Sequence, residues 1–292
     1  MWFKNLIVYR LPENWAMSAE QLQQKLADKP LLPCSGLQKQ NRGWVPVAGD
    51  ERLVLTAGRH YLLALGLEQK LLPASVINQV ARERAVELEA QQGFKVGRKA
   101  MKDLREQVAD ELLPRAFALR STVHVWIDPV GGWLVVNAAA MGKAEAVLEM
   151  LNKTLDGLPL ELWQTQRAPG TVMTDWLAAG EAEGGFTLER ELELRAAGEG
   201  RSTVRYANHT LEGEEIRAHI ADGKRATRLG LTWRDRVSFV LTESLQIKKV
   251  EFLEVIRDQA AEAEDDVALM QLSFTLMSGE LAQLLREIQD SL

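Results

Sequence analysis

Two narrow apolar stripes at helical spacing lie between residues 73 and 113. Pro73 suits the first turn of a helix. The stripes consist of Ile77, Ala81, Ala85 and Leu88, and of Met101, Leu104, Val108 and Leu112. Because stripes this thin cannot both bury themselves in a core, they predict a projecting helical arm that packs mainly on itself.

Outside the arm, alternating apolar runs in pairs precede helical patterns. Strands are predicted over 3–11, 53–56, 61–67, 122–127, 133–137, 160–163, 186–194, 204–206, 228–233, 237–241 and 246–252. Helices are predicted after Ser18 and over 144–151, 172–177, 212–221 and 270–288. Strand pairs followed by helices favour an α+β fold with antiparallel sheets and flanking helices over a doubly wound parallel sheet.

Breaks in these patterns predict three parts. Residues 1–72 and 118–180 would form a central α/β region, and residues 73–117 the helical arm with a subunit contact. A run of small residues over 180–185 separates a second α+β lobe, residues 181–292, which ends in a strong helix.

The bulk composition narrows the class of protein. The chain has 292 residues, 46% of them hydrophobic and 26% charged, as in ordinary globular proteins. A net charge of −6 argues against a histone-like coat protein. A single cysteine, Cys34, allows no internal disulfide and fits a reducing cytoplasm. We expect no signal peptide and no membrane span.

Charge is segregated along the chain. Residues 93–105 contain five bases and one acid, and residues 201–249 have a balance of +4. Residues 171–200 have a balance of −5, and residues 251–292 a balance of −8. The fold could therefore present basic and acidic faces separately, and binding follows the local field rather than the total charge.

Two basic groups are candidate contacts to a polyanion. The turn between the two helices of the arm, called the arm turn below, carries Lys95, Arg98, Lys99 and Lys102. Lys224, Arg225 and Arg228 follow Gly223, where we expect a helix to give way to a strand and the side chains to reach outward together. Phosphate binding needs cations on one face without precise spacing, so these groups predict salt-sensitive, sequence-independent binding.

Catalytic patterns are missing from the sequence. The glycines and lysines near residue 95 do not have phosphate-loop spacing, and the four histidines have no metal-ligand spacing with one another or with Cys34. We therefore predict no catalytic residue, no metal site, no cofactor and no enzymatic activity. Phe117, just beyond Pro114 and Arg115, is a candidate contact point for another subunit.

Several segments resemble one known family, that of the bacterial recombination-associated protein RdgC. They are MWFKNL at 1–6, YRL at 9–11, GWVP at 43–46, LLPRAF at 112–117, WID at 126–128 and GKRATRLGLTW at 223–233. The likeness runs along nearly the whole chain. The chain departs from the family at Phe94 and Gly97, where better-known relatives have a lysine-rich turn.

The resemblance implies a cytoplasmic, nucleoid-associated, non-enzymatic DNA-binding protein. Two subunits would form a ring-shaped homodimer around a hole wide enough for duplex DNA. It would bind double-stranded and also single-stranded DNA with little sequence preference and restrain RecA in recombination and replication. By the same resemblance, Phe117 matches a residue at a subunit contact and Lys224 one on the DNA-facing surface.

A second reading stays open. In this reading the chain is a protein-interaction module that restrains a recombinase such as RecA by direct contact through its acidic C-terminal part. Charge reversal over residues 264–266 would then matter more than loss of Lys224, Arg225 and Arg228. A nuclease is a third reading, without support from any carboxylate–histidine pattern.

Overall fold

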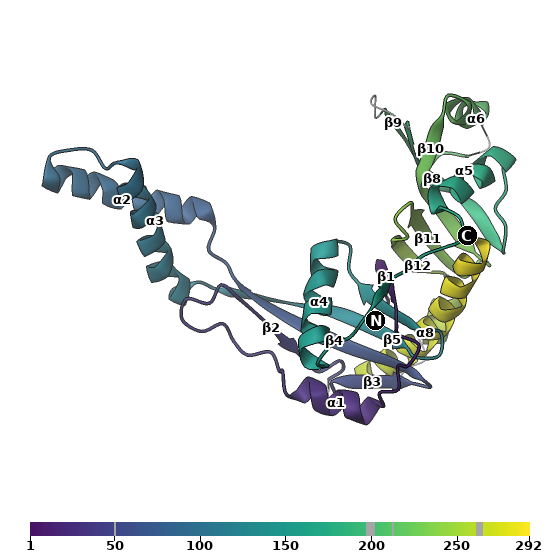
Figure 1. Ribbon diagram of the computed structural model, residues 1–292, viewed down its shortest axis with the longest axis horizontal. Coiled ribbons are helices and arrows are strands. Elements are labelled where there is room, and N and C mark those ends of the chain that lie inside the picture. The colour runs from purple at the N-terminus through teal and green to yellow at the C-terminus, as the bar shows by residue number, and fades with distance from the viewer. Residues whose placement is uncertain (50, 197–201, 212, 261–264) are drawn as a thin grey trace. The chain divides into compact units, whose positions relative to one another are not determined.

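A computed structural model (Figure 1) describes residues 1–49, 51–196, 202–211, 213–260 and 265–292. Within these residues the chain has an α+β fold with a large antiparallel sheet and eight α-helices, which confirms the predicted class. The strands are β1 (Leu6–Arg10), β2 (Gln40–Trp44), β3 (Val54–Ala57), β4 (His60–Lys70), β5 (Ala118–Asp128), β6 (Trp133–Asn137), β7 (Glu161–Leu162), β8 (Phe186–Ala196), β9 (Thr203–Ala207), β10 (Lys224–Trp233), β11 (Val237–Thr242) and β12 (Ile247–Phe252). The helices are α1 (Ala19–Ala27), α2 (Ala74–Gln92), α3 (Arg98–Leu112), α4 (Met141–Thr154), α5 (Pro169–Ala179), α6 (Glu214–Ala221), α7 (Glu254–Ala260) and α8 (Asp266–Ser291).

The chain divides into two compact units. Unit 1 comprises residues 1–28, 46–64 and 123–292, and unit 2 comprises residues 29–45 and 65–122. The long strands β4 and β5 each begin in one unit and end in the other. The three-part division, the projection of the arm and the ring-shaped homodimer stay predictions.

The sheet of unit 1 contains the strand order β4-β5-β6-β1-β12-β11-β10-β8-β9, with β3 beside β4 and β7 beside β1. Every pairing between these strands whose register is described is antiparallel, and the partners in β8–β9, β10–β11 and β11–β12 also follow one another along the chain. The predicted hairpin is confirmed as β5–β6, in which Asp128 pairs with Trp133. In that hairpin Asp128 accepts hydrogen bonds from the amides of Val130 and Gly131 at 3.0 and 2.9 Å.

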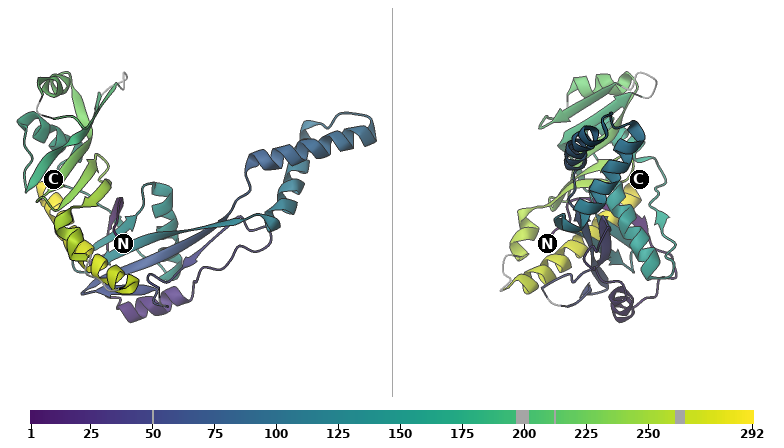
Figure 2. Two further views of the ribbon diagram at one scale, coloured as in Figure 1. Left: turned by 180° about the vertical axis from the view of Figure 1, so that it is seen from behind. Right: turned by 90° about the vertical axis from the view of Figure 1, so that its left-hand side faces the viewer.

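The C-terminal helix α8 fills the core of unit 1. Six apolar side chains of the predicted stripe are buried, namely Phe274, Met277, Leu281, Leu284, Leu285 and Ile288. The helix runs along the sheet (Figure 2) from β3, where Gln271 donates to the carbonyl of Thr56 at 2.7 Å. Near its other end Glu287 accepts from Nε1 of Trp233 on β10 at 2.5 Å. The periodic stripe thus specifies one helix that joins distant strands.

Unit 2 contains the predicted helical hairpin of α2 and α3. The helices lie side by side, with Ala81, Ala85 and Val108 buried between them. Arg84 of α2 and Glu111 of α3 form an ion pair at 2.7 Å. Most of the remaining stripe is only half-buried, which is consistent with two thin faces that cover each other.

Strand β2 was not predicted. Its sequence, Gln40 to Trp44, does not alternate, but it pairs along β4 from Gln40 opposite Gln69 to Trp44 opposite Leu65. Gly43 permits the close approach of the preceding segment, because a Cβ at this position would lie 2.2 Å from the backbone N of Leu31. A backbone contact of this kind leaves no apolar pattern in the sequence.

Two further details differ from expectation. Helix α7 was not predicted, and β10 begins at Lys224 rather than at Arg228. Because α6 ends at Ala221, Lys224 and Arg225 follow the predicted helix-to-strand junction but already belong to the strand. The strand starts early because Lys224 and Arg225 already pair with Ala196 and Arg195 of β8. Glu212, expected to begin a helix, and Glu264, in the acidic group, lie outside the described residues. No helix in the described ranges is long and apolar enough to cross a membrane.

Candidate nucleic-acid interface

The arm turn is built from a left-handed glycine and an uncapped helix start. Helix α2 ends at Gly93, which has φ +80°. The carboxylate of Glu89 accepts from the amide of Val96 at 2.7 Å and holds the turn back against α2. Helix α3 then begins after Gly97, which has no side chain to cap it. The turn is therefore fixed at its base, and the first amides of α3 have no side-chain acceptor.

The four predicted bases of this turn are all exposed, namely Lys95, Arg98, Lys99 and Lys102. Lys102 lies 3.6 Å from Glu106 on the same helix. Lys95, Arg98 and Lys99 form no ion pair within the described residues. Cations in the first turn of a helix oppose the helix dipole, which favours anions there. This position favours an anion that meets both the cations and the open amides of α3.

The second predicted basic group is divided between the two faces of β10. Lys224 contacts Nδ1 of His219 at 3.2 Å, whereas Arg225 lies opposite Arg195 of β8 on the other face. A bulge after Ala226 brings Arg228 to the same face as Arg225. The structure thus brings Arg225 and Arg228 together and separates Lys224 from them.

Four bases of the sheet, Arg228 among them, pair with glutamates of β8, whereas Arg225 contacts the hydroxyl of Thr171 at 3.4 Å. Glu193 is only 4% exposed and contacts Arg205 at 2.7 Å and Arg195 at 3.2 Å. Glu191 contacts Arg228 at 3.7 Å and Lys249 at 2.6 Å. We call these glutamates and their four bases the β8–β10 charge network.

The network changes the pKa of its buried member. Burial acts to raise the pKa of Glu193, but hydrogen bonds from Thr227 and Arg205 and the nearby guanidinium charges together lower it below its usual range. Glu193 is therefore a carboxylate at neutral pH.

This pairing corrects the expectation of separate acidic and basic faces. The acidic segment 171–200 and the basic segment 201–249 place their charges on neighbouring strands, where they neutralise each other. Counting charge by segment missed the pairing because β8, β9 and β10 become neighbours only when the sheet forms.

The candidate subunit contact follows α3 directly. Pro114 and Arg115 lie in a short 3₁₀ helix (Leu113–Arg115) and are exposed. Phe117 is 85% exposed, and its carbonyl accepts from the amide of Leu71 at 2.7 Å. Leu71 and Leu119 are also more than half exposed. Several large apolar side chains open to water at one place are typical of a protein interface.

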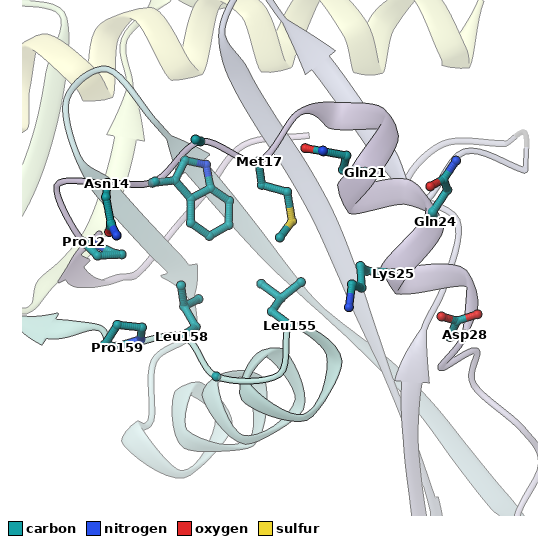
Figure 3. A pocket seen from close by; sticks show the side chains of 13 residues that line it. Pro12, Asn14, Met17, Gln21, Gln24, Lys25, Asp28, Leu155, Leu158 and Pro159 are labelled. Atoms are coloured by element: carbon teal, nitrogen blue, oxygen red, sulfur yellow. The ribbon is translucent and has the colours of Figure 1, made fainter.

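A cavity in unit 1 lacks the features of a polyanion site. It has a volume of about 670 Å³, and Figure 3 shows Met17, Leu155 and Leu158 pointing into it. Lys25 lines its edge but is held by Asp156 at 2.6 Å. Within the described residues no group of three His, Cys, Asp or Glu side chains could hold a metal ion.

Comparison with known proteins places the whole chain in one family. Residues 1–292 match the family model described as "Putative exonuclease, RdgC". Three relatives are each named recombination-associated protein RdgC. The protein of Janthinobacterium sp. (strain Marseille) is 51% identical over 99% of this chain and 96% of its own length. Those of Herminiimonas arsenicoxydans and Burkholderia cenocepacia are each 50% identical over 100% of this chain and over 98% and 95% of their own lengths.

The family model and the relatives differ in what their names state. The model's description names an exonuclease, whereas the relatives' names state an association with recombination and no catalytic activity. Both cover the chain from end to end, which confirms the resemblance seen in its sequence segments. The chain belongs to the RdgC family of recombination-associated proteins.

Proposed function

We propose that this protein binds DNA through its phosphates, with little sequence preference, and thereby restrains RecA-dependent recombination and replication. The observation that carries the proposal is the arm turn, where Lys95, Arg98 and Lys99 are exposed and form no ion pair within the described residues. A chain with a net charge of −6 as a whole repels DNA at long range. A cluster of uncompensated bases is therefore the place where a polyanion would bind.

The chemistry of the arm turn favours backbone contacts over base readout. Its cations stand on flexible stems beside open helix amides, and phosphate oxygens accept from both. Such contacts displace counterions from DNA, so affinity falls steeply with salt and depends little on sequence. Arg225 and Arg228 would add contacts after exchanging their protein partners, and Lys224 would act from the opposite face of β10.

We further propose that the protein acts as a ring-shaped homodimer that encircles or coats duplex DNA. The apolar group around Phe117, with Pro114 and Arg115, would meet its copy in a second subunit. A two-fold contact uses the same patch on both subunits, and two separate contacts close the assembly. Cations would be needed only on the inner wall, which suits a negative total charge. The protein would be located in the cytoplasm, at the nucleoid.

The proposal includes no catalytic activity. Because the family description names an exonuclease, the assay is direct. End-labelled linear DNA is incubated with the protein and Mg²⁺ or Mn²⁺, and the release of nucleotides is followed. Release that rises with protein concentration would refute the non-enzymatic proposal.

The test of DNA binding is fluorescence anisotropy on duplex DNA across a salt series. The triple variant K95Q/R98Q/K99Q removes three charges from the arm turn. The magnitude of the slope of log affinity against log salt concentration should decrease by up to about 2.7, or about 0.9 for each lost phosphate contact. The control K29Q/K143Q/K153Q removes three exposed charges outside the arm turn and should leave the slope nearly unchanged.

Retention on closed circles tests encirclement. The ring predicts a fraction that stays bound to circular DNA at high salt and is released when the circle is cut. Equal slopes for both triple variants would refute the arm-turn contact. If changes in the acidic C-terminal part abolish the restraint of recombination and changes in the bases do not, the interaction-module reading is favoured.

A further inference from the structure

A second cavity in unit 1 combines aromatic and cationic side chains. It has a volume of about 560 Å³ and lies between the segment before β1, strand β12 and helix α7. Its lining includes Trp2, Lys4, Asn5, Lys249, Phe252 and Arg257. A cavity of this size falls within the range of about 300–1,000 Å³ typical of sites for small organic groups.

The N-terminal segment places Trp2 and Lys4 on the same side. It is extended beside β12, where the amide of Val250 donates to the carbonyl of Lys4 at 2.9 Å. Phe3 points the other way into the core, and its amide contacts Sδ of Met277 at 3.2 Å. Because side chains alternate along an extended chain, Trp2 and Lys4 both line the cavity.

The aromatic wall is a pair of rings. The centroids of Trp2 and Phe252 lie 4.7 Å apart, at an interplanar angle of 39°. Phe252 is buried, whereas Trp2 is only half-buried. The indole therefore has a packed side against Phe252 and retains surface for another planar group.

The cationic wall has three bases and one acid. Lys4 and Arg257 are exposed and form no ion pair in the described part of the chain. Lys249 is held by Glu191, which also holds Arg228 of β10. The acid is Glu251. The cavity thus joins the β8–β10 charge network through a shared carboxylate.

The backbone at Lys249 is in an unusual conformation. Its φ of +52° is left-handed, a region that residues other than Gly, Asn and Asp rarely adopt. It occurs at a bulge where β12 has one residue more than β11 between the pairs Ser238–Glu251 and Val240–Lys248. Bulges re-aim side chains, and backbone strain is concentrated at binding sites.

We propose that this cavity binds one unpaired nucleotide of single-stranded DNA. The base would stack on Trp2, and the flanking phosphates would contact Lys4 and Arg257, with Lys249 exchanging Glu191 for phosphate. The proposal rests on the proposed DNA-binding function and adds a site that distinguishes strands. Bases inside a duplex are stacked on each other and cannot reach an indole, whereas any unpaired base offers a π face.

The test compares labelled oligothymidylate with a blunt duplex of equal length by fluorescence anisotropy. The variant W2L keeps apolar packing but loses the aromatic face. It should bind the single strand roughly 5- to 150-fold more weakly, the range that loss of one stacking contact gives, and bind the duplex as the wild type does. The variant W2F should recover most of the single-strand affinity. Thermal unfolding of both variants checks that they fold.

The cations are tested in the same assay. The double variant K4Q/R257Q should lower the salt slope on the single strand by about 1.4, or about 0.7 for each lost phosphate contact. The control K29Q/K143Q loses the same charge elsewhere and should leave the slope near that of the wild type. Crosslinking to an oligonucleotide with 5-iododeoxyuridine should yield an adduct on Trp2.

The outcomes separate this site from the general proposal. Wild-type protein that binds duplex DNA, with W2L unchanged on the single strand or the adduct far from Trp2, would overturn the nucleotide site alone. If thymidine monophosphate binds as tightly as the oligomer, the assignment of the cavity to DNA is overturned. Wild-type protein that binds neither DNA would refute the proposed function itself.

Discussion

Replacing Glu191 with Gln should strengthen DNA binding. Glu191 accepts a hydrogen bond from Lys249 at 2.6 Å and forms an ion pair with Arg228 at 3.7 Å. A phosphate that contacts either base must first displace this carboxylate. Removing the charge of Glu191 takes away the competitor and leaves both bases available.

The magnitude follows from the exposure of the pairs. The side chain of Glu191 is 31% exposed, and those of Arg228 and Lys249 are 33% and 63% exposed. Pairs this accessible contribute about 0.2–1 kcal/mol each, because water and salt screen them. Two pairs give about 0.4–2 kcal/mol, which corresponds to roughly 2- to 30-fold tighter binding. The salt slope should also rise, by at most about 1.8 for two new contacts.

The assay is anisotropy on duplex DNA across a salt series, with E149Q as the control. Glu149 pairs with Lys153 on α4 at 2.6 Å, so E149Q makes the same change in net charge outside the network. If E191Q and E149Q shift the affinity equally, the gain comes from total charge alone. That result would refute competition between Glu191 and DNA phosphates.

Three other changes test the fold and the assembly. F117A should weaken self-association in analytical ultracentrifugation while changing the free energy of unfolding by less than about 0.5 kcal/mol. The control V130A, at another exposed apolar residue, should change the free energy of unfolding equally little. An F117A dimer as tight as that of the wild type would contradict the contact. E193Q should lower the free energy of unfolding at pH 7 by about 1–2 kcal/mol, measured by urea unfolding. Because the pKa of Glu193 is lowered in the folded protein, its ionic contribution to stability is present above the ordinary glutamate pKa of about 4.3 and is lost as pH falls through the folded pKa. The difference in free energy of unfolding between wild type and E193Q should therefore disappear in acid. A difference independent of pH would refute this. G43A should destabilise the protein by about 1–3 kcal/mol because its Cβ would strike backbone, whereas G142A, with open space around it, should not; equal stabilities would contradict the close approach.

Periodic elements were predictable because one face of each is buried. The stripe from Phe274 to Ile288 can only be a helix with one apolar side, and the α2–α3 hairpin follows from two thin stripes of the same kind. Strand β2 was not predictable, because its partner β4 supplies the apolar residues and Gly43 supplies only space. The arm-turn bases could be found from sequence since they are local. The β8–β10 charge network could not, because its pairs join residues from different strands.

This difference between local and assembled charge bears on how salt dependence should be interpreted. A free base such as Lys99 displaces a counterion from DNA when it meets a phosphate, so it adds its full share to the slope. A paired base such as Arg228 frees Glu191 as it binds, and the freed carboxylate remains beside the phosphate and offsets the gained charge. Contacts from the β8–β10 charge network therefore increase the affinity for DNA but add little to its salt dependence. A wild-type slope near that expected for the arm turn alone would not exclude Arg228 from the interface, and the E191Q slope is the measurement that separates the two kinds of contact.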